Sequence, residues 1–196
     1  MTGAGAGAEL VVVGTSLGGM QALEVILHGL MPDFPLPIAV VQHRGADFGV
    51  ASELGNILQL HSALPIVEAG DKEPIRGGTV YLAPPDYHLL VDAGRFALSV
   101  DARVMHARPS IDVLFGSAAD SYREALLAVL LTGASADGTA GARRVKARGG
   151  TVIAQDPRGA ESPIMPQAAI SVGVVDRVLP LSEIAPFLNV ASVTHR

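Results

Sequence analysis

The feature that most constrains this chain is a set of continuous aliphatic runs, each followed by a glycine-containing turn and a segment with helical periodicity. The runs lie at Glu9–Val13, Ile38–Val41 and Leu126–Leu131. Runs without polar alternation are typical of parallel strands whose two faces are both covered by helices. Aromatic residues make up only 4% of the chain and Trp is absent, so Val, Ile, Leu and Ala must build the core. The pattern predicts an α/β fold.

The middle of the chain has a different pattern. Short runs separated by turn residues predict an antiparallel meander over Thr79–Ala83, His88–Asp92 and Phe96–Val100. Strand–turn–helix units resume after it, beginning with a helix from a Ser110 N-cap to about Tyr122. We therefore expect a three-layer α/β/α fold with a doubly wound, mainly parallel sheet and an antiparallel edge. A length of 196 residues suits a single domain over 1–196, whose residues 1–8 form a disordered Gly/Ala tail.

Charge and hydropathy exclude several function classes. The net charge is −5 and no long run of Lys or Arg occurs, which disfavours a nucleic-acid or anionic-membrane partner. No apolar segment reaches the roughly 20 residues of a membrane span, and the amino terminus lacks the features of a signal peptide. Cysteine is absent, so disulfides, thiolate catalysis and Cys-based zinc sites are excluded. We expect a soluble, cytoplasmic protein whose oligomeric state the sequence leaves open.

A serine lies in the turn after the first aliphatic run. Residues 14–18 fit the pattern G-x-S-x-G, with Ser16 at its centre and a helix expected from about Met20. A sharp turn of this kind lifts the serine oxygen clear of the sheet, and the amino end of the following helix favours an oxyanion there. The main alternative is a nucleotide-binding loop formed by Gly14, Ser16 and Gly19. It is disfavoured because serine replaces the central glycine and no acidic residue ends the second strand.

A base and an acid are available at the ends of two other predicted strands. His43 follows the second run, so a neighbouring parallel strand would place it beside Ser16. Asp137 follows the third run, and the crevice would then hold a Ser, a His and an Asp. The alternative for Asp137 is an ordinary N-cap of the helix that it precedes. Asp112 is a second candidate acid, although its position is typical of a first-turn helix residue.

Several separated motifs together resemble one family, the catalytic domain of chemotaxis-type protein-glutamate methylesterases, which also act as glutaminyl deamidases. The resemblance covers about Leu10 to Leu188. The matching segments are Gly-Thr-Ser-Leu-Gly-Gly at 14–19, Val-Val-Gln-His at 40–43, Tyr-Leu-Ala-Pro-Pro-Asp at 81–86, His88, Arg-Pro-Ser-Ile-Asp-Val-Leu-Phe at 108–115, Leu-Thr-Gly at 131–133, Asp-Gly-Thr-Ala-Gly at 137–141, Ala-Gln at 154–155 and Met-Pro at 165–166.

The resemblance implies a Ser16–His43–Asp137 triad and, as substrate, γ-methyl glutamate on the cytoplasmic helical part of a chemoreceptor. It implies no metal or cofactor. The oxyanion would face main-chain N–H groups near Leu17 and Ala134. Ala134 departs from the family, which commonly has Met there. The family's usual receiver domain is also expected to be absent. Two alternatives stay open: a serine esterase or amidase acting on another substrate, and a signalling module that binds without turnover.

The rim of the predicted crevice carries small residues and nearby arginines. Gly18 and its neighbours would let a substrate helix approach the nucleophile closely. A cation at Arg44 or Arg108 would hold the charged product more strongly than the neutral methyl ester. The alternative is that these arginines cap main-chain carbonyls.

Overall fold

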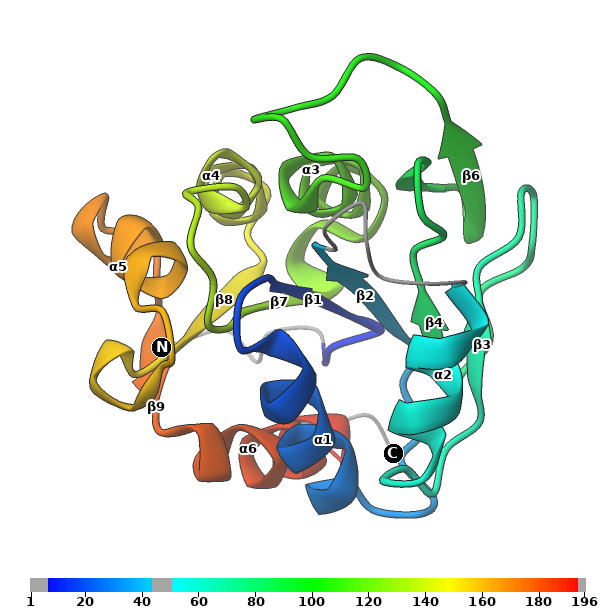
Figure 1. The fold of residues 1–196 in the computed structure, drawn as a ribbon, viewed down its shortest axis with the longest axis horizontal. Helices are drawn as coiled ribbons and strands as arrows, with labels where there is room; N and C mark the ends of the chain where they lie inside the picture. The colour runs from blue at the N-terminus through cyan, green and yellow to red at the C-terminus, as the bar shows by residue number, and fades with distance from the viewer. Residues whose placement is uncertain (1–6, 44–50, 194–196) are drawn as a thin grey trace.

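The computed structural model describes residues 7–43 and 51–193. Its main sheet has seven strands in the order β3-β4-β2-β1-β7-β8-β9, and all the neighbouring strands pair in parallel (Figure 1). These strands are β1 (Leu10–Thr15), β2 (Ile38–Gln42), β3 (Ile66–Glu68), β4 (Val80–Leu82), β7 (Leu126–Leu130), β8 (Thr151–Gln155) and β9 (Arg177–Leu179). Residues 1–6 of the expected amino-terminal tail lie outside the described residues.

Helices cover both faces of the sheet, as the aliphatic runs predict. The described helices are α1 (Gly19–Gly29), α2 (Ala51–Gln59), α3 (Ile111–Tyr122), α4 (Thr139–Ala147), α5 (Ile164–Ser171) and α6 (Leu181–Val193), with short 3-10 turns at Arg123–Ala125 and Pro157–Gly159. Figure 1 shows α1, α2 and α6 on one face and α3, α4 and α5 on the other. Alternate β1 residues enter the two cores: Val11 packs on the α1 side and Val12 on the α3 side. The three-layer α/β/α prediction is confirmed.

The antiparallel part differs in detail from the expected meander. Among the strands that the structure describes, only β5 (His88–Asp92) and β6 (Arg95–Ser99) pair in antiparallel fashion, as a separate two-stranded sheet. The first expected meander strand is β4, which pairs in parallel with both β2 and β3. All three β4 residues are buried, so their apolar run matches a central parallel strand. The expectation of a three-stranded meander was therefore wrong.

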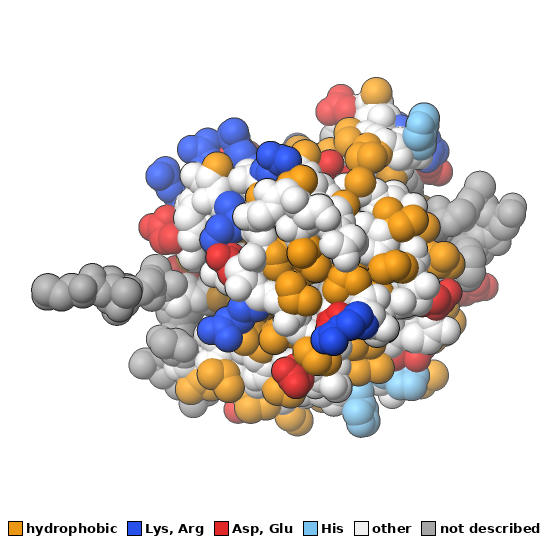
Figure 2. Space-filling model, turned by 90° about the vertical axis from the view of Figure 1, so that its left-hand side faces the viewer, with side chains coloured by type: hydrophobic (Ala, Val, Ile, Leu, Met, Phe, Trp, Pro, Cys, Tyr) orange, Lys and Arg blue, Asp and Glu red, His pale blue; other side chains and the backbone are white. Residues whose placement is uncertain are grey.

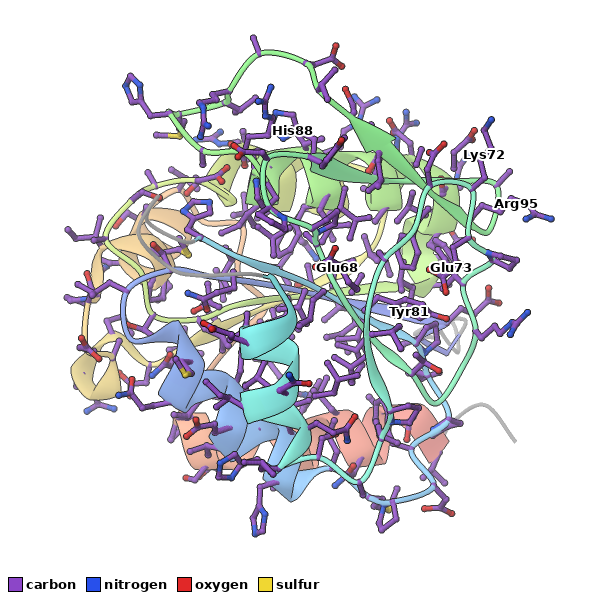
Figure 3. All side chains as sticks on the ribbon, turned by 45° about the vertical axis from the view of Figure 1, so that its right-hand side comes forward. Glu68, Lys72, Glu73, Tyr81, His88 and Arg95 are labelled. Atoms are coloured by element: carbon purple, nitrogen blue, oxygen red, sulfur yellow. The ribbon has the colours of Figure 1, made fainter. Side chains whose placement is uncertain are left out.

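The loop before β4 is hydrogen-bonded to the hairpin that β5 and β6 form. The Lys72 and Phe96 amides each donate across this junction, to the carbonyls of Phe96 and Glu73 respectively, both at 2.9 Å. Tyr81 on β4 packs its ring 4.8 Å from that of Phe96. Figure 3 shows Lys72, Glu73 and Arg95 at this junction, away from His88 at the start of β5. The hairpin is thus an outer layer packed over α3.

Strand register brings the ends of the three central strands together. Thr15 at the end of β1 pairs with Gln42 at the end of β2, and Gly14 pairs with Leu130 at the end of β7. The residues that follow these strands therefore lie at one edge of the sheet, where open α/β folds place their sites.

One side of the molecule carries a group of exposed hydrophobic side chains. Figure 2 views the side on which α5 lies in Figure 1 and shows these side chains between Lys or Arg and Asp or Glu residues. Ile164 on α5 is 52% exposed, and Leu17, directly after Ser16, is 54% exposed. Among the described residues, none of the helices combines the length and the hydropathy needed to cross a lipid bilayer.

Candidate active site

Ser16 lies in the tight turn between β1 and α1. Its amide donates to the Thr132 carbonyl at 3.0 Å, and its carbonyl accepts the Gly19 amide at 2.9 Å. Gly18 is the N-cap of α1 with φ of 77°, a left-handed conformation that favours glycine. A Cβ at Gly18 would also meet the Glu161 side chain at 2.7 Å. The G-x-S-x-G turn has the strand–turn–helix setting predicted for it, and the half-buried Ser16 lies at the positive end of α1.

His43 directly follows β2 and lies next to the Ser16 turn. Its amide donates to the Thr15 carbonyl at 3.0 Å, which continues the β1–β2 pairing by one residue. The His43 Nε2 atom lies 2.7 Å from Oδ2 of Asp137, and the imidazole is 14% exposed. Because an ionised carboxylate only accepts hydrogen bonds, Nε2 carries the proton in the neutral ring. Nδ1 is then the nitrogen able to accept a proton, and it has no hydrogen-bond partner among the described residues.

Asp137 is fully buried and receives donors from several segments. Oδ2 accepts His43 Nε2 and the Ile111 amide, each at 2.7 Å. Oδ1 accepts the Ser110 hydroxyl at 2.9 Å and the amides of Asp112 and Gly138 at 3.0 Å. Asp137 therefore caps α3, whereas Gly138 is the N-cap position of α4 and provides no side-chain cap. The alternative from the sequence, that Asp137 is the ordinary N-cap of α4, therefore does not fit these contacts.

These donors determine the charge of Asp137. Burial alone would raise its pKa, but the hydrogen bond from His43 and the amides of Asp112 and Ile111 outweigh burial and hold the pKa below the ordinary value of 3.8. The amino end of α3 adds its positive partial charge at the same place. Asp137 is thus ionised at neutral pH, and it can orient the His43 ring and stabilise the imidazolium.

The three side chains are not joined in one continuous hydrogen-bonded chain. The Ser16 hydroxyl has no hydrogen-bond partner among the described residues, so the structure pairs His43 with Asp137 but not with Ser16. Hydrogen bonds between nucleophile and base are often long in active sites without substrate and shorten when it binds. The positions of the three residues, after β1, β2 and β7, are therefore compatible with a triad in which the contact between Ser16 and His43 forms when a substrate binds.

The main-chain amides of Leu17 and Ala134 have no acceptor among the described residues. The two residues that precede Ala134 bind two other segments of the chain. The Gly133 amide donates to the Ser162 carbonyl at 3.0 Å, and the Thr132 hydroxyl donates to the Leu17 carbonyl at 2.9 Å. Ala134 itself is exposed. An oxyanion formed at Ser16 could accept from both amides, the role that the resemblance implies.

Of the two arginines considered as product-binding cations, the structure describes only Arg108. Arg108 Nη1 donates to the carbonyls of Val100 and Asp101, at 2.8 and 3.1 Å. This arrangement favours its capping role in the loop before α3. Arg44 lies outside the described residues.

The structure adds residues that the sequence did not single out for the site. Ser110 occupies the N-cap position of α3, but it makes no side-chain cap and its hydroxyl reaches Asp137 instead. His88, which is almost completely buried, accepts the Ser110 amide at Nδ1 and binds the Ala102 carbonyl through Nε2 (Figure 3). The sequence pointed to both residues only through the family resemblance, because His88 and the segment 108–115 are among the matching segments.

A serine, a histidine and a buried, ionised aspartate at the carboxyl edge of a doubly wound sheet define a class of site suited to acyl transfer. The particular family follows from comparison with known proteins. Residues 11–188 match the family described as CheB methylesterase, and the chain belongs to that family.

Relatives and a solved structure agree with this assignment. A protein from Leptospira interrogans, provisionally named protein-glutamate methylesterase/protein-glutamine glutaminase, is 44% identical over 90% of this chain and 91% of its own length. A protein from Anaeromyxobacter dehalogenans, named protein-glutamate methylesterase/protein-glutamine glutaminase 2, is 46% identical, and the match spans 90% of this chain but 51% of that relative. The crystal structure of the Thermotoga maritima CheB methylesterase catalytic domain has 38% identity and a TM-score of 0.88, covering 94% of this chain and 98% of the other.

Proposed function

We propose that this chain hydrolyses γ-methyl esters of glutamate side chains in a protein substrate, with Ser16 as nucleophile, His43 as general base and Asp137 as the group that orients His43. The observation that carries the triad is the 2.7 Å contact between His43 Nε2 and Oδ2 of the buried Asp137, next to the Ser16 turn. Family membership and the names of the relatives support the ester hydrolysis.

The reaction divides into two acyl transfers. Ser16 Oγ attacks the ester carbonyl carbon while His43 Nδ1 takes the hydroxyl proton, and the amides of Leu17 and Ala134 receive the oxyanion. Collapse of this intermediate expels methanol, to which the imidazolium returns the proton. Water then attacks the glutamyl-Ser16 ester by the same route, and a glutamate carboxylate and free Ser16 result. Asp137 stays ionised throughout and stabilises the imidazolium.

Glutamine deamidation is a second activity of the same site. The relatives are named as protein-glutamine glutaminases as well as methylesterases. The γ-amide of glutamine has its carbonyl at the same position of the side chain as the methyl ester, and ammonia would leave in place of methanol. No additional residue is required for this reaction.

The substrate that we propose is the cytoplasmic helical part of a methylated chemoreceptor, which the enzyme meets in the cytoplasm. A glutamate on a helix surface requires a site open to a protein. Support comes from the exposed Leu17 and Ala134 on either side of the half-buried Ser16. A test would compare methanol release from a methylated receptor fragment and from an unrelated helical peptide bearing the same ester. Equal rates would contradict receptor selectivity while leaving the esterase activity in place.

The triad is tested by methanol release from the S16A, H43A and double variants. Each single variant is expected to lose several orders of magnitude in kcat, and the double variant little more, because the residues act as a unit. S182A on α6 and H28A on α1 are matched controls, since both side chains are exposed and lie outside the site. Additive losses, or substantial turnover by S16A, would contradict the assignment. Absence of turnover by the unaltered chain would favour a binding module.

A further inference from the structure

Gln42 makes an unusual connection between the two sides of the candidate site. Its Nε2 group donates one hydrogen bond to the Ser16 carbonyl at 2.8 Å and another to the His43 carbonyl at 3.0 Å. One side-chain amide thereby binds the main chain of both the proposed nucleophile and the proposed base. Both partners only accept, so the orientation of the Gln42 amide is fixed by chemistry.

The bond to the Ser16 carbonyl also determines where the Leu17 N–H points. The Ser16 carbonyl and the Leu17 amide belong to one planar trans peptide, in which C=O and N–H point in opposite directions. Gln42 and the Gly19 amide both hold the carbonyl, the latter at 2.9 Å. Their pull directs the Leu17 N–H to the opposite side, and this donor has no acceptor among the described residues.

This placement of Gln42 carries a cost in stability. Its Oε1 atom is buried and lacks a hydrogen-bond partner within the described part of the chain, a state that costs about 1–3 kcal/mol. The same oxygen occupies the space beside Gly19, where any Cβ would collide with it. Side chains that keep a buried polar atom unsatisfied are expected mainly where function requires them. The two donated bonds are the benefit that accompanies this cost.

We propose that Gln42 is a positioning residue, which orients the Leu17 N–H toward the oxyanion and fixes the distance between the Ser16 and His43 main chains. The proposal rests on the proposed function, because it takes Ser16 as the nucleophile and Leu17 as an oxyanion donor. Gln42 does not touch the reacting atoms and acts through these two peptides.

The test is Q42M, which keeps the length of the side chain and removes both donors. Loss of a well-placed oxyanion donor costs about 10²–10³ in kcat, so misorientation should cost about 10-fold to 100-fold. KM is expected to change by no more than about threefold, since the substrate makes no contact with Gln42. Affinity for a trifluoromethyl ketone analogue of the glutamyl side chain, whose Ser16 adduct carries the oxyanion, should fall by the same factor as kcat/KM.

Gln59 provides the matched control. Its Nε2 group likewise donates to two carbonyls, those of Ser62 and Leu64 at 3.1 Å each, but it lies at the end of α2. Q59M should lose two donated bonds, as Q42M does, and also the bond that Gln59 Oε1 accepts from the Ile66 amide, with no change in kcat or in analogue affinity. Q42N is a second, smaller variant: it keeps an amide that is too short to reach both carbonyls, and it should lose kcat as Q42M does.

The outcomes separate the two proposals. Wild-type kcat in both Gln42 variants, with S16A inactive, would overturn the role of Gln42 alone. A loss of kcat that follows the loss of thermal stability, with analogue affinity unchanged, would mean that Gln42 is merely structural and would also overturn it. Turnover by S16A would overturn the proposed function, and the role of Gln42 with it.

Discussion

The amino ends of α3 and α4 each receive a carboxylate from the other segment, yet the pKa values of the two carboxyl groups shift in opposite directions. Asp137, which precedes α4, accepts the amides of Ile111 and Asp112 at the start of α3. Asp112 in turn accepts the amides of Gly138 and Gly141 at the start of α4, at 2.9 and 2.6 Å. The arrangement is nearly symmetric. It holds together two helices that pack side by side on one face of the sheet (Figure 1).

The difference lies in the additional donors. Burial raises the pKa of Asp112, the nearby Asp137 charge adds to this, and the Gly141 and Gly138 amides only partly offset it. Asp137 is also buried, but it accepts a hydrogen bond from His43 besides those from its amides, and its pKa is lowered. The number and charge of the donors therefore decide the direction in which the pKa of each carboxyl group moves. The carboxylate with the lowered pKa is the one that meets His43.

The largest effect is expected for D137N. The substitution removes the charge that orients His43 and places an NH₂ group against donors, so kcat should fall by about three to four orders of magnitude. D112N is the matched comparison, since Asn Oδ1 can still accept from Gly138 and Gly141. Steady-state methanol release and circular dichroism of both variants would check this. A D137N protein that unfolds, with activity lost only in proportion, would favour a purely capping role.

A smaller effect is expected for S110A. This change removes one of the neutral donors to Asp137 and leaves the His43 contact in place. A hydrogen bond to a charged group contributes about 1.5–3 kcal/mol, so a kcat loss of about 10-fold to 100-fold is expected. The acid limb of the kcat–pH profile should also shift, because Asp137 is then less well satisfied. An unchanged profile together with unchanged kcat would show that Ser110 does not support the aspartate.

The two carboxylates should also affect stability with opposite dependence on pH. Asp112 has a raised pKa, so its favourable contribution is present below its unfolded value of about 3.8 and is lost as the pH rises through the raised pKa. Asp137 has a lowered pKa, so its contribution is present above about 3.8 and is lost as the pH falls through the lowered pKa.

Urea unfolding of the two variants between about pH 3 and pH 7 would measure this contrast. The free energy of unfolding of D112N, relative to that of the unaltered chain, should increase as the pH rises. That of D137N should decrease over the same interval. If these two free energies changed with pH in the same direction, the opposite pKa shifts of Asp112 and Asp137 would be contradicted. D112N should meanwhile keep kcat within about tenfold, because it leaves every donor to Asp137 in place.

The smallest effect on turnover is expected for R108A, in the loop that leads into α3. Arg108 donates to the carbonyls of Val100 and Asp101, so its loss should lower the free energy of unfolding by about 1–2 kcal/mol. Inhibition by the glutamate product should not change. Weaker product inhibition without a loss of stability would restore the product-binding role considered from the sequence.

Local signals in the sequence predicted one half of the site better than the other. The Ser16 turn could be predicted because its strand, glycine turn and helix are adjacent in the chain. His43 followed from strand adjacency, since β1 and β2 are consecutive strands that pair directly. The reciprocal caps could not be predicted, because Asp112 and Asp137 lie 25 residues apart and either could cap its own helix. Similarly, the apolar run Val80–Leu82 fits a hairpin strand as well as a buried parallel strand. Its parallel pairing with β2, which is not visible in the sequence, distinguishes the two.

Mapping of a fluorophosphonate adduct would test the central claim, that Ser16 is a nucleophile activated by His43 and Asp137, most directly. The probe reacts with activated serines, and mass spectrometry of the digested protein identifies the residue that carries the phosphonyl group. A single adduct is expected, on the peptide that contains Ser16. Its rate of formation should be sharply reduced in H43A and D137N and unchanged in H28A. An adduct on another serine, or labelling of Ser16 at the same rate in H43A, would contradict the activation of Ser16 by this triad.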